Sequence, residues 1–211
     1  MQPVAKKAPA PSLFPIFLKL EGQCCLVVGA GTVAEGKISG LLDAAAQVRV
    51  VAPEATAQVR SWAAAGQIEW LARPCDPSDL EGMFLVVAAT DSQELHENIY
   101  AEARRRGVLC NVVDVPELCD FYYPAVAQRG ALQIAVSTSG QSPALAQRLR
   151  KELEEQFGPE YEAWLHQLGE EREKLFAANN MDSEERKRLL HDLASADAFK
   201  SFLRKRKRTK K

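Results

Sequence analysis

The chain has 211 residues, 46% of them hydrophobic, and a formal net charge of −1 at pH 7. Such a length suits one domain of ordinary size with a smaller appendage, and the apolar content is sufficient for a packed core. The near-neutral charge gives no general attraction to nucleic acid or a membrane, and no apolar run reaches the roughly 18 residues needed to cross a bilayer.

Cysteine and histidine spacing argues against a disulfide framework and a metal centre. The five cysteines are an odd number with no C-x-x-C pair, so we expect reduced thiols and a cytoplasmic location. His96, His166 and His191 fall on separate predicted helices without ligand spacing, and we expect no preformed metal site. Residues 1–12 and the basic block 204–211 are predicted to be disordered tails, although the block could bind an anionic partner.

A glycine-containing turn follows the first apolar run. Residues 24–34 read C-C-L-V-V-G-A-G-T-V-A, a strand that leads into a G-x-G-x-x-A turn and a helix. In a dinucleotide-binding turn of this kind, Gly29 permits the tight bend, Gly31 lets the backbone approach a pyrophosphate, and Ala34 keeps the helix close to the sheet. The alternative is a strand–helix turn that binds nothing.

Strand and helix signals alternate after this turn. Apolar runs and helical periodicity predict helix 33–44, strand 48–52, helix 54–65, strand 68–71, strand 84–89, helix 92–106 and strand 108–113. The third of the five strands in chain order, 68–71, alternates in polarity and is predicted to be exposed or at an edge. Five strands joined by right-handed crossovers give an α/β fold, a Rossmann-type doubly wound parallel sheet.

The pattern changes after this region. Residues 121–127 and 132–137 are predicted to be two strands around Gln128-Arg129-Gly130, followed by a helix over 143–157 and by helices alone from residue 159. A two-stranded element with one helix buries little by itself, so we expect it to pair with the same element of another subunit. The predicted domains are a Rossmann domain 13–115, a dimerisation module 116–157 and a helical part 158–203.

Ligands of open parallel sheets bind beyond the carboxyl ends of the strands. The residues expected there to contact a dinucleotide are Gly29, Gly31, Thr32, Val33, Pro53, Glu54, Thr90, Asp91 and Asn111. Glu54 lies slightly past the usual position of a ribose-binding acid, and it could instead be a carboxylate in the first turn of the next helix. No arginine directly follows that strand, which favours NAD over NADP.

Asp114 is the predicted catalytic carboxylate. It ends a buried apolar strand at the expected crevice, where a partly desolvated acid can accept a proton near neutral pH. Asp91 and Asp120 are alternative candidates for the catalytic carboxylate, but each also has a structural interpretation. Asp91 would cap the helix that begins at Ser92, and Asp120 would lie in the loop before residue 121.

A hydroxyl-rich segment precedes the helix predicted over 143–157. Its residues Ser137, Thr138, Ser139, Gly140 and Ser142 place hydroxyls and free N–H groups at a helix N-terminus, which attracts carboxylates or phosphates. We expect them to bind substrate. Ser142 followed by proline is also an ordinary N-cap.

These residues together resemble the precorrin-2 dehydrogenase/sirohydrochlorin ferrochelatase family, the siroheme synthase N-terminal module. The similarity extends over about residues 14–157, and its most specific motifs are N-V-V-D, F-Y-Y-P-A and S-T-S-G-Q-S-P-A-L-A in this order. The resemblance implies a homodimer, an essential aspartate at Asp114, and a helical C-terminal part over the cleft. It also places Thr138 where some relatives carry a phosphorylated serine. Beyond residue 159 the similarity is poor.

The resemblance further implies that the chain oxidises the tetrapyrrole precorrin-2 to sirohydrochlorin with NAD. Hydride goes to the cofactor while Asp114 accepts the proton or orients the macrocycle. Insertion of Fe²⁺ or Co²⁺ into the product is left open, since some relatives only oxidise. A non-catalytic NAD-binding redox sensor is the alternative function.

Overall fold

The computed structural model describes residues 12–178 and 181–209. It divides the chain into two compact units, Met1–Tyr123 and Pro124–Lys211. The expected tail 1–12 lies, except for Ser12, outside the described residues.

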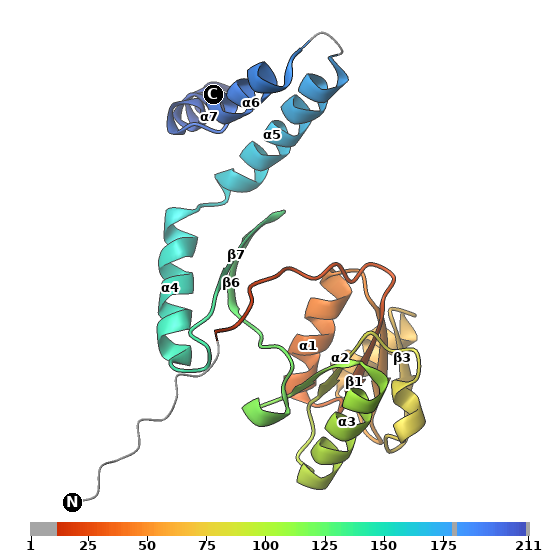
Figure 1. Ribbon diagram of the computed structural model, residues 1–211. Helices are drawn as coiled ribbons and strands as arrows, with labels where there is room; N and C mark the ends of the chain where they lie inside the picture. Colours follow the sequence, from red (N-terminus) through yellow and green to blue (C-terminus); the bar gives the residue numbers. More distant parts are fainter. Residues whose placement is uncertain (1–11, 179–180, 210–211) are drawn as a thin grey trace, which may run out of the picture. The chain divides into compact units, whose positions relative to one another are not determined.

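The first unit is a five-stranded parallel sheet with the strand order β3-β2-β1-β4-β5. Figure 1 shows this sheet together with the helices α1, α2 and α3. Its strands are β1 Cys24–Val28, β2 Gln47–Val51, β3 Ile68–Leu71, β4 Leu85–Ala88 and β5 Leu109–Val112. The helices between them are α1 Thr32–Asp43, α2 Ala57–Ala64 and α3 Gln93–Arg106, with short 3₁₀ turns at Pro77–Leu80 (η1) and Pro116–Leu118 (η2). The predicted doubly wound fold is confirmed, and β3 lies at an edge.

Two hydrophobic cores lie on opposite faces of this sheet. On one face, α1 and α2 bury Ile38 and Val59 against Val27 and other strand residues. On the other face, α3 buries Ile99 against Leu26, and Leu80 of η1 joins the same cluster. Because both faces are covered, β4 is buried along its whole length, which explains its continuous apolar sequence.

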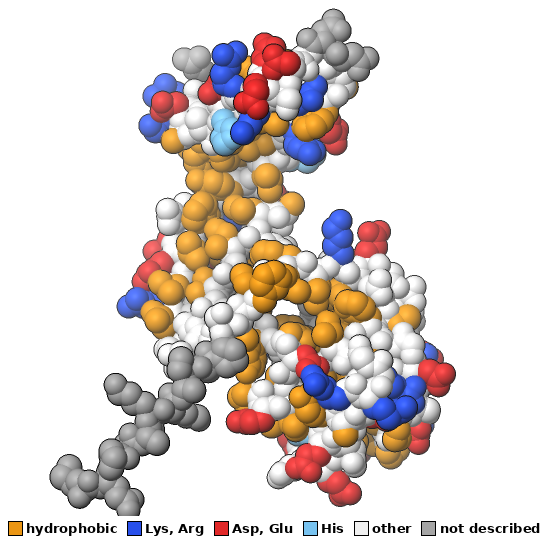
Figure 2. Space-filling model, in the orientation of Figure 1, with side chains coloured by type: hydrophobic (Ala, Val, Ile, Leu, Met, Phe, Trp, Pro, Cys, Tyr) orange, Lys and Arg blue, Asp and Glu red, His pale blue; other side chains and the backbone are white. Residues whose placement is uncertain are grey.

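The second unit begins with a hairpin, β6 Ala125–Arg129 and β7 Leu132–Val136, against which α4 Pro143–Gln156 packs. Three helices follow: α5 Glu160–Ala177, α6 Ser183–Leu193 and α7 Ala196–Thr209. Along β7, half-buried apolar positions alternate with exposed ones, as in a strand with one covered face. Figure 2 shows hydrophobic side chains at the surface near the hairpin and mixed charges over the last helices.

The first predicted hairpin strand was placed too early. It begins at Ala125, and Gln128 and Arg129 belong to the strand instead of the turn. The reason is that residues preceding it remain attached to β5: the Asp120 N–H donates to Cys110 O at 2.7 Å, and the Asn111 side chain donates to Phe121 O at 2.8 Å. The two compact units of the structure meet between Tyr123 and Pro124.

The last helix also differs from the sequence prediction. Residues 204–209 of the expected disordered tail are the final part of α7. The helix is anchored by Phe199, whose ring centroid lies 4.5 Å from that of Tyr161 and 4.7 Å from that of Trp164 on α5. Lysine and arginine are themselves good helix formers, so a helix fixed by these rings continues through the basic block.

Candidate functional site

The glycine turn joins β1 to α1 between the ends of β2 and β4. The Gly29 N–H donates to Val51 O at 3.0 Å, and its φ of +103° is one that residues with a side chain rarely adopt. A Cβ at this position would lie 2.1 Å from Ala89 O, well inside contact distance. Only glycine therefore fits here, and the predicted role of Gly29 in the bend agrees with this geometry.

The N-terminus of α1 is free to accept an anion. Its N-cap is Gly31, which supplies no side-chain acceptor, whereas α2, α3, α4 and α6 are each capped by a hydroxyl or carboxylate of their own N-cap residue. A Cβ on Gly31 would meet nothing within 4 Å, and Ala34 is fully buried against the sheet. Thr32 and Val33 lie exposed in the first turn. This open turn with unused N–H groups fits the pyrophosphate of a dinucleotide.

The loop after β2 lies beside this turn. Its Thr56 N–H donates to Ala30 O at 3.1 Å, and Pro53 and Glu54 are exposed. The alternative reading of Glu54 as a first-turn carboxylate is wrong, because Thr56 caps α2 through Val59 N and the helix starts at Ala57. Glu54 thus stays available to a ligand.

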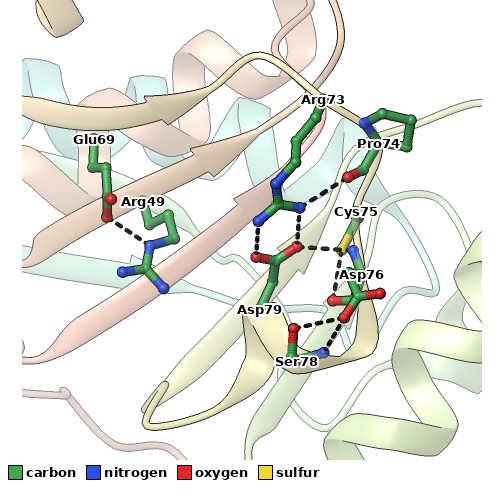
Figure 3. A network of polar contacts seen from close by, with 8 residues as sticks. All are labelled: Arg49, Glu69, Arg73, Pro74, Cys75, Asp76, Ser78 and Asp79. Atoms are coloured by element: carbon green, nitrogen blue, oxygen red, sulfur yellow. Dashed lines mark hydrogen bonds and ion pairs between the residues drawn. The ribbon is translucent and has the colours of Figure 1, made fainter.

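The arginines on the strands nearest this loop are already paired. Arg49 donates to Glu69 at 2.6 Å, and Arg73 holds both oxygens of the buried Asp79 carboxylate, at 2.6 and 2.8 Å (Figure 3). The Arg73 guanidinium lowers the pKa of Asp79 below its ordinary value. These pairs occupy the guanidinium groups of β2 and of the chain after β3.

At the end of β4, Thr90 is held by a histidine that the sequence analysis did not assign to the site. Thr90 Oγ1 lies 2.9 Å from Nε2 of His96, which is only 7% exposed. Ser92, and not Asp91, caps α3 by accepting from Leu95 N at 3.3 Å, so the structural reading of Asp91 is wrong. Asp91 itself is exposed. Its expected contact with the cofactor stays a prediction.

Asp114 lies at the tip of a tight turn after β5. The Val115 N–H donates to Val112 O at 3.2 Å, and Asp114 adopts a left-handed φ of +62°. Its side chain is exposed, contrary to the expected partial desolvation. The turn carries the residue past the last buried strand position, Val112, and so out of the core.

Cys119 and Asn111 hold the Asp114 turn in place. The Cys119 Sγ lies 3.1 Å from Val112 O and 3.2 Å from Val115 O, so its one proton is shared between carbonyls that precede and follow Asp114 in the turn. Asn111, which is 5% exposed, donates from Nδ2 to Phe121 O and to Cys119 Sγ. Sequence reasoning missed Cys119. It also predicted Asn111 as a cofactor contact, whereas the structure uses its amide N–H groups to hold this loop.

Asp120 has a structural role, which was the alternative to a catalytic one. Its carboxylate accepts from Cys110 N at 3.0 Å and from Arg104 at 3.2 Å, and its side chain is 17% exposed. A carboxylate engaged in this way is not free to act on a substrate. Asp114 is therefore the better candidate for acid–base chemistry.

Lys37 is a second residue that sequence reasoning missed. It is half-buried on α1, and its Nζ lies 3.6 Å from the ring centroid of Tyr123. Burial lowers the pKa of Lys37, while the nearby Asp114 and Cys119 oppose that effect. The link between Lys37 and Asp114 joins residues far apart in the chain and could not be read from a local pattern.

The hydroxyl-rich segment belongs to the second unit, at the N-terminus of α4. Ser142 caps the helix through Leu145 N, as the ordinary reading predicted, at 3.3 Å. Ser137 Oγ accepts from Ser139 N, and Thr138 Oγ1 accepts from Ser142 N, both at 3.1 Å. Left-handed φ values at Ser139 and Gly140 complete the turn. The hydroxyl groups of Ser137, Thr138 and Ser142 thus accept local hydrogen bonds, and their substrate contacts stay predictions.

Comparison with known proteins identifies the first unit. The family model described as "Putative NAD(P)-binding" matches residues 16–125, more than half of the chain. The chain belongs to this NAD(P)-binding family. A second family model, described as "Sirohaem biosynthesis protein central", matches residues 129–156, which include α4 and most of the hairpin.

Individual relatives of this NAD(P)-binding protein agree with that result. Siroheme synthase of Nitrosococcus oceani is 44% identical over 140 residues, and siroheme synthase 3 of Aeromonas hydrophila is 45% identical over 140 residues. Each match covers 66% of this chain and 30% of the relative, so the chain spans less than a third of the length of these curated relatives. The resemblance found in the sequence is confirmed.

The solved structure of SirC, a precorrin-2 dehydrogenase, matches almost the whole fold. Its TM-score is 0.75 at 28% identity, and the match covers 92% of this chain and 98% of SirC. The match therefore includes both units of the NAD(P)-binding protein, the second as well as the first.

The described residues of the NAD(P)-binding protein contain neither a cluster of metal ligands nor a membrane-spanning helix. Over 12–178 and 181–209, no three His, Cys, Asp or Glu side chains cluster as metal ligands. No helix in those ranges has the length and apolar character to cross a membrane. All five cysteines are free thiols, and Cys25 and Cys110 are buried.

Proposed function

We propose that the chain catalyses the NAD-dependent oxidation of precorrin-2 to sirohydrochlorin. One observation carries this proposal: the open glycine turn and the Asp114 turn follow strands of one parallel sheet and lie at the same carboxyl edge, in a fold that matches SirC. A cofactor at the first turn and an acid at the second are the two elements that a dehydrogenation needs.

The reaction removes one hydride and one proton from the substrate and gives NADH, a proton and the more oxidised tetrapyrrole. The bound nicotinamide supplies the hydride-accepting chemistry. Gly31 and the first N–H groups of α1 would hold the pyrophosphate, Gly29 shapes the bend that precedes them, and Thr32 and Val33 line the same turn. The Asp114 carboxylate accepts the proton at one of its oxygens, and the Cys119 thiol keeps the turn in place.

We propose NAD as the cofactor in preference to NADP. Exposed Glu54 follows β2 near the position where an acid binds the ribose hydroxyls, and it would repel a 2′-phosphate. Both terminal nitrogens of Arg73 contact Asp79, and Nε of Arg49 is paired with Glu69, so these arginines are directed to carboxylates of the chain itself. Glu54→Ala is expected to weaken binding of NADH as well as NAD⁺, and a titration that follows NADH fluorescence measures this change.

We further propose a cytoplasmic homodimer that pairs through the second unit. A two-stranded sheet is marginal alone, and the hairpin unit leaves apolar side chains such as Leu145, 39% exposed, at its surface. Light scattering after size exclusion tests this: a monomer at micromolar concentration would contradict it.

The loop of Ser137, Thr138, Ser139, Gly140 and Ser142 is proposed to bind substrate carboxylates.

The deciding experiment is an anaerobic assay with precorrin-2 and NAD⁺, with and without Fe²⁺ or Co²⁺. Formation of NADH and sirohydrochlorin supports the dehydrogenase, and metal uptake by the product tests the chelatase. Cofactor binding without turnover would leave the alternative of a redox-sensing domain.

Asp114→Asn is expected to lower kcat by about 10² to 10⁴-fold without changing NAD affinity. Glu117→Gln is the matched control, because Glu117 is an exposed acid in the same loop. Its activity should equal that of the wild type. If Asp114→Asn were fully active, the assigned role of Asp114 would be wrong.

A further inference from the structure

Lys37 differs from the arginines that follow β3 and that end α3. Arg73, Arg104, Arg105 and Arg106 each contact a carboxylate. Within the described residues, the Lys37 ammonium makes no ion pair or hydrogen bond, and its one close contact is the Tyr123 ring, 3.6 Å away. A half-buried ammonium with unused donors is an incomplete arrangement.

The Tyr123 ring holds this ammonium in place. A cation over the face of an aromatic ring is stabilised by the ring's negative face. Burial lowers the pKa of Lys37, and the nearby Asp114 acts in the opposite direction. Tyr123 belongs to the segment that follows Asp114, and Val113 and Phe121 of the same part of the chain pack against the core cluster that contains Ile38 of α1.

The position of Lys37 separates it from the cofactor phosphates. It lies five residues after Thr32, where α1 begins. At a rise of about 1.5 Å per residue, this places its backbone roughly 7 Å along the helix from the N–H groups that suit a pyrophosphate. The Lys37 ammonium itself lies over Tyr123, in the segment that follows Asp114, so we assign its anion to a ligand on that side.

We propose that Lys37 binds a peripheral carboxylate of an anionic tetrapyrrole and so holds the macrocycle next to Asp114. This inference rests on the proposed function and adds a substrate-binding residue to it. A tetrapyrrole of this type carries carboxylates around its rim, and a lysine with three free donors beside an aromatic ring can bind one of them. Tyr123, 43% exposed, offers an apolar surface beside the same carboxylate.

The test compares Lys37→Met with Lys37→Arg. Methionine keeps the length and the contact with the Tyr123 ring but removes the charge, and arginine restores the charge. Lys19→Met is the matched control, since Lys19 is exposed and precedes β1 at the opposite edge of the sheet. Circular dichroism verifies that each variant is folded.

The first measurement is the affinity for uroporphyrin III, a stable tetrapyrrole polycarboxylate, by fluorescence titration at two salt concentrations. Lys37→Met is expected to bind about tenfold more weakly with a smaller salt dependence. Lys37→Arg should recover most of the affinity, and Lys19→Met should match the wild type. The affinity for NAD⁺ should be unchanged in all variants.

The second measurement is turnover of precorrin-2, in which Lys37→Met should raise KM more than it lowers kcat. Equal uroporphyrin affinity in wild type and Lys37→Met would overturn the role of Lys37 even if the wild type is an active dehydrogenase. If the wild type binds uroporphyrin through Lys37 but does not oxidise precorrin-2, the proposed reaction fails and the anion site stands. Absence of any tetrapyrrole binding overturns both.

Discussion

The two glycines of the dinucleotide turn should fail in different ways when each is replaced. In Gly29→Ala, the new methyl group would lie 2.1 Å from Ala89 O, and the residue would have to keep a φ of +103°. Backbone strain of this kind costs about 1 to 3 kcal/mol. Forcing a methyl group into a packed site costs about 1 to 3 kcal/mol more.

The sum, about 2 to 6 kcal/mol, is a large part of the stability of a typical domain. The thermal midpoint of the first unit should therefore fall by on the order of 10 °C. Circular dichroism melting measures this change. Gly31→Ala is the control, since a Cβ on Gly31 meets nothing within 4 Å and φ there is −83°.

Gly31→Asp should also fold, yet it should abolish NAD binding, because its carboxylate would occupy the place of the pyrophosphate. Isothermal titration measures that loss. A Gly29→Ala protein that melts with the wild type would refute the close approach of Ala89. Unchanged cofactor titration in Gly31→Asp would refute the location of the phosphates.

Three further outcomes follow from the loop, the ion pair and the first helix. Cys119→Ala should lower kcat about tenfold at unchanged NAD affinity because the Asp114 turn loses the hydrogen bond that the thiol shares between Val112 O and Val115 O. Cys119→Ser should restore part of the lost kcat, and a wild-type kcat in Cys119→Ala would show that the thiol does not position Asp114. Arg73 lowers the pKa of Asp79, so the stability that this ion pair contributes is present above the ordinary pKa of 3.8 and is lost as pH falls through the lower pKa of the folded state. The melting temperature of the wild type should therefore fall more steeply below about pH 4 than that of Asp79→Asn. Parallel dependence of the two melting temperatures on pH would contradict this. Gly40→Ala should raise the free energy of unfolding by about 0.5 to 1 kcal/mol, because residue 40 is helical and a Cβ there meets no other atom. Urea unfolding measures this change, and a lower free energy of unfolding in the variant would contradict the prediction.

Much of the first unit could be predicted from the sequence because its signals are local. The residues of β1 and β4 form unbroken apolar runs since helices cover both faces, and the G-x-G-x-x-A spacing fixes the turn between β1 and α1. The N-cap at Ser142 followed by Pro143 was equally readable.

What could not be predicted depends on contacts between distant residues. Asp114 is exposed because it lies in a turn to which the Cys119 thiol is hydrogen-bonded. The Lys37 ammonium contacts the Tyr123 ring only in the folded protein. The helical state of residues 204–209 depends on the packing of Phe199 against α5. Local composition carries no signal for such contacts, since it records neither partner nor distance.

The missing side-chain cap on α1 has a consequence for how the protein can be observed. Backbone amides in the first turn of this helix have no internal acceptor, so in the free protein they should exchange with deuterated solvent as fast as those of a loop. A bound diphosphate would take up the same amides and slow their exchange. Mass spectrometry of the peptide around Thr32 would then report occupancy of the glycine turn directly, whether or not a tetrapyrrole is present.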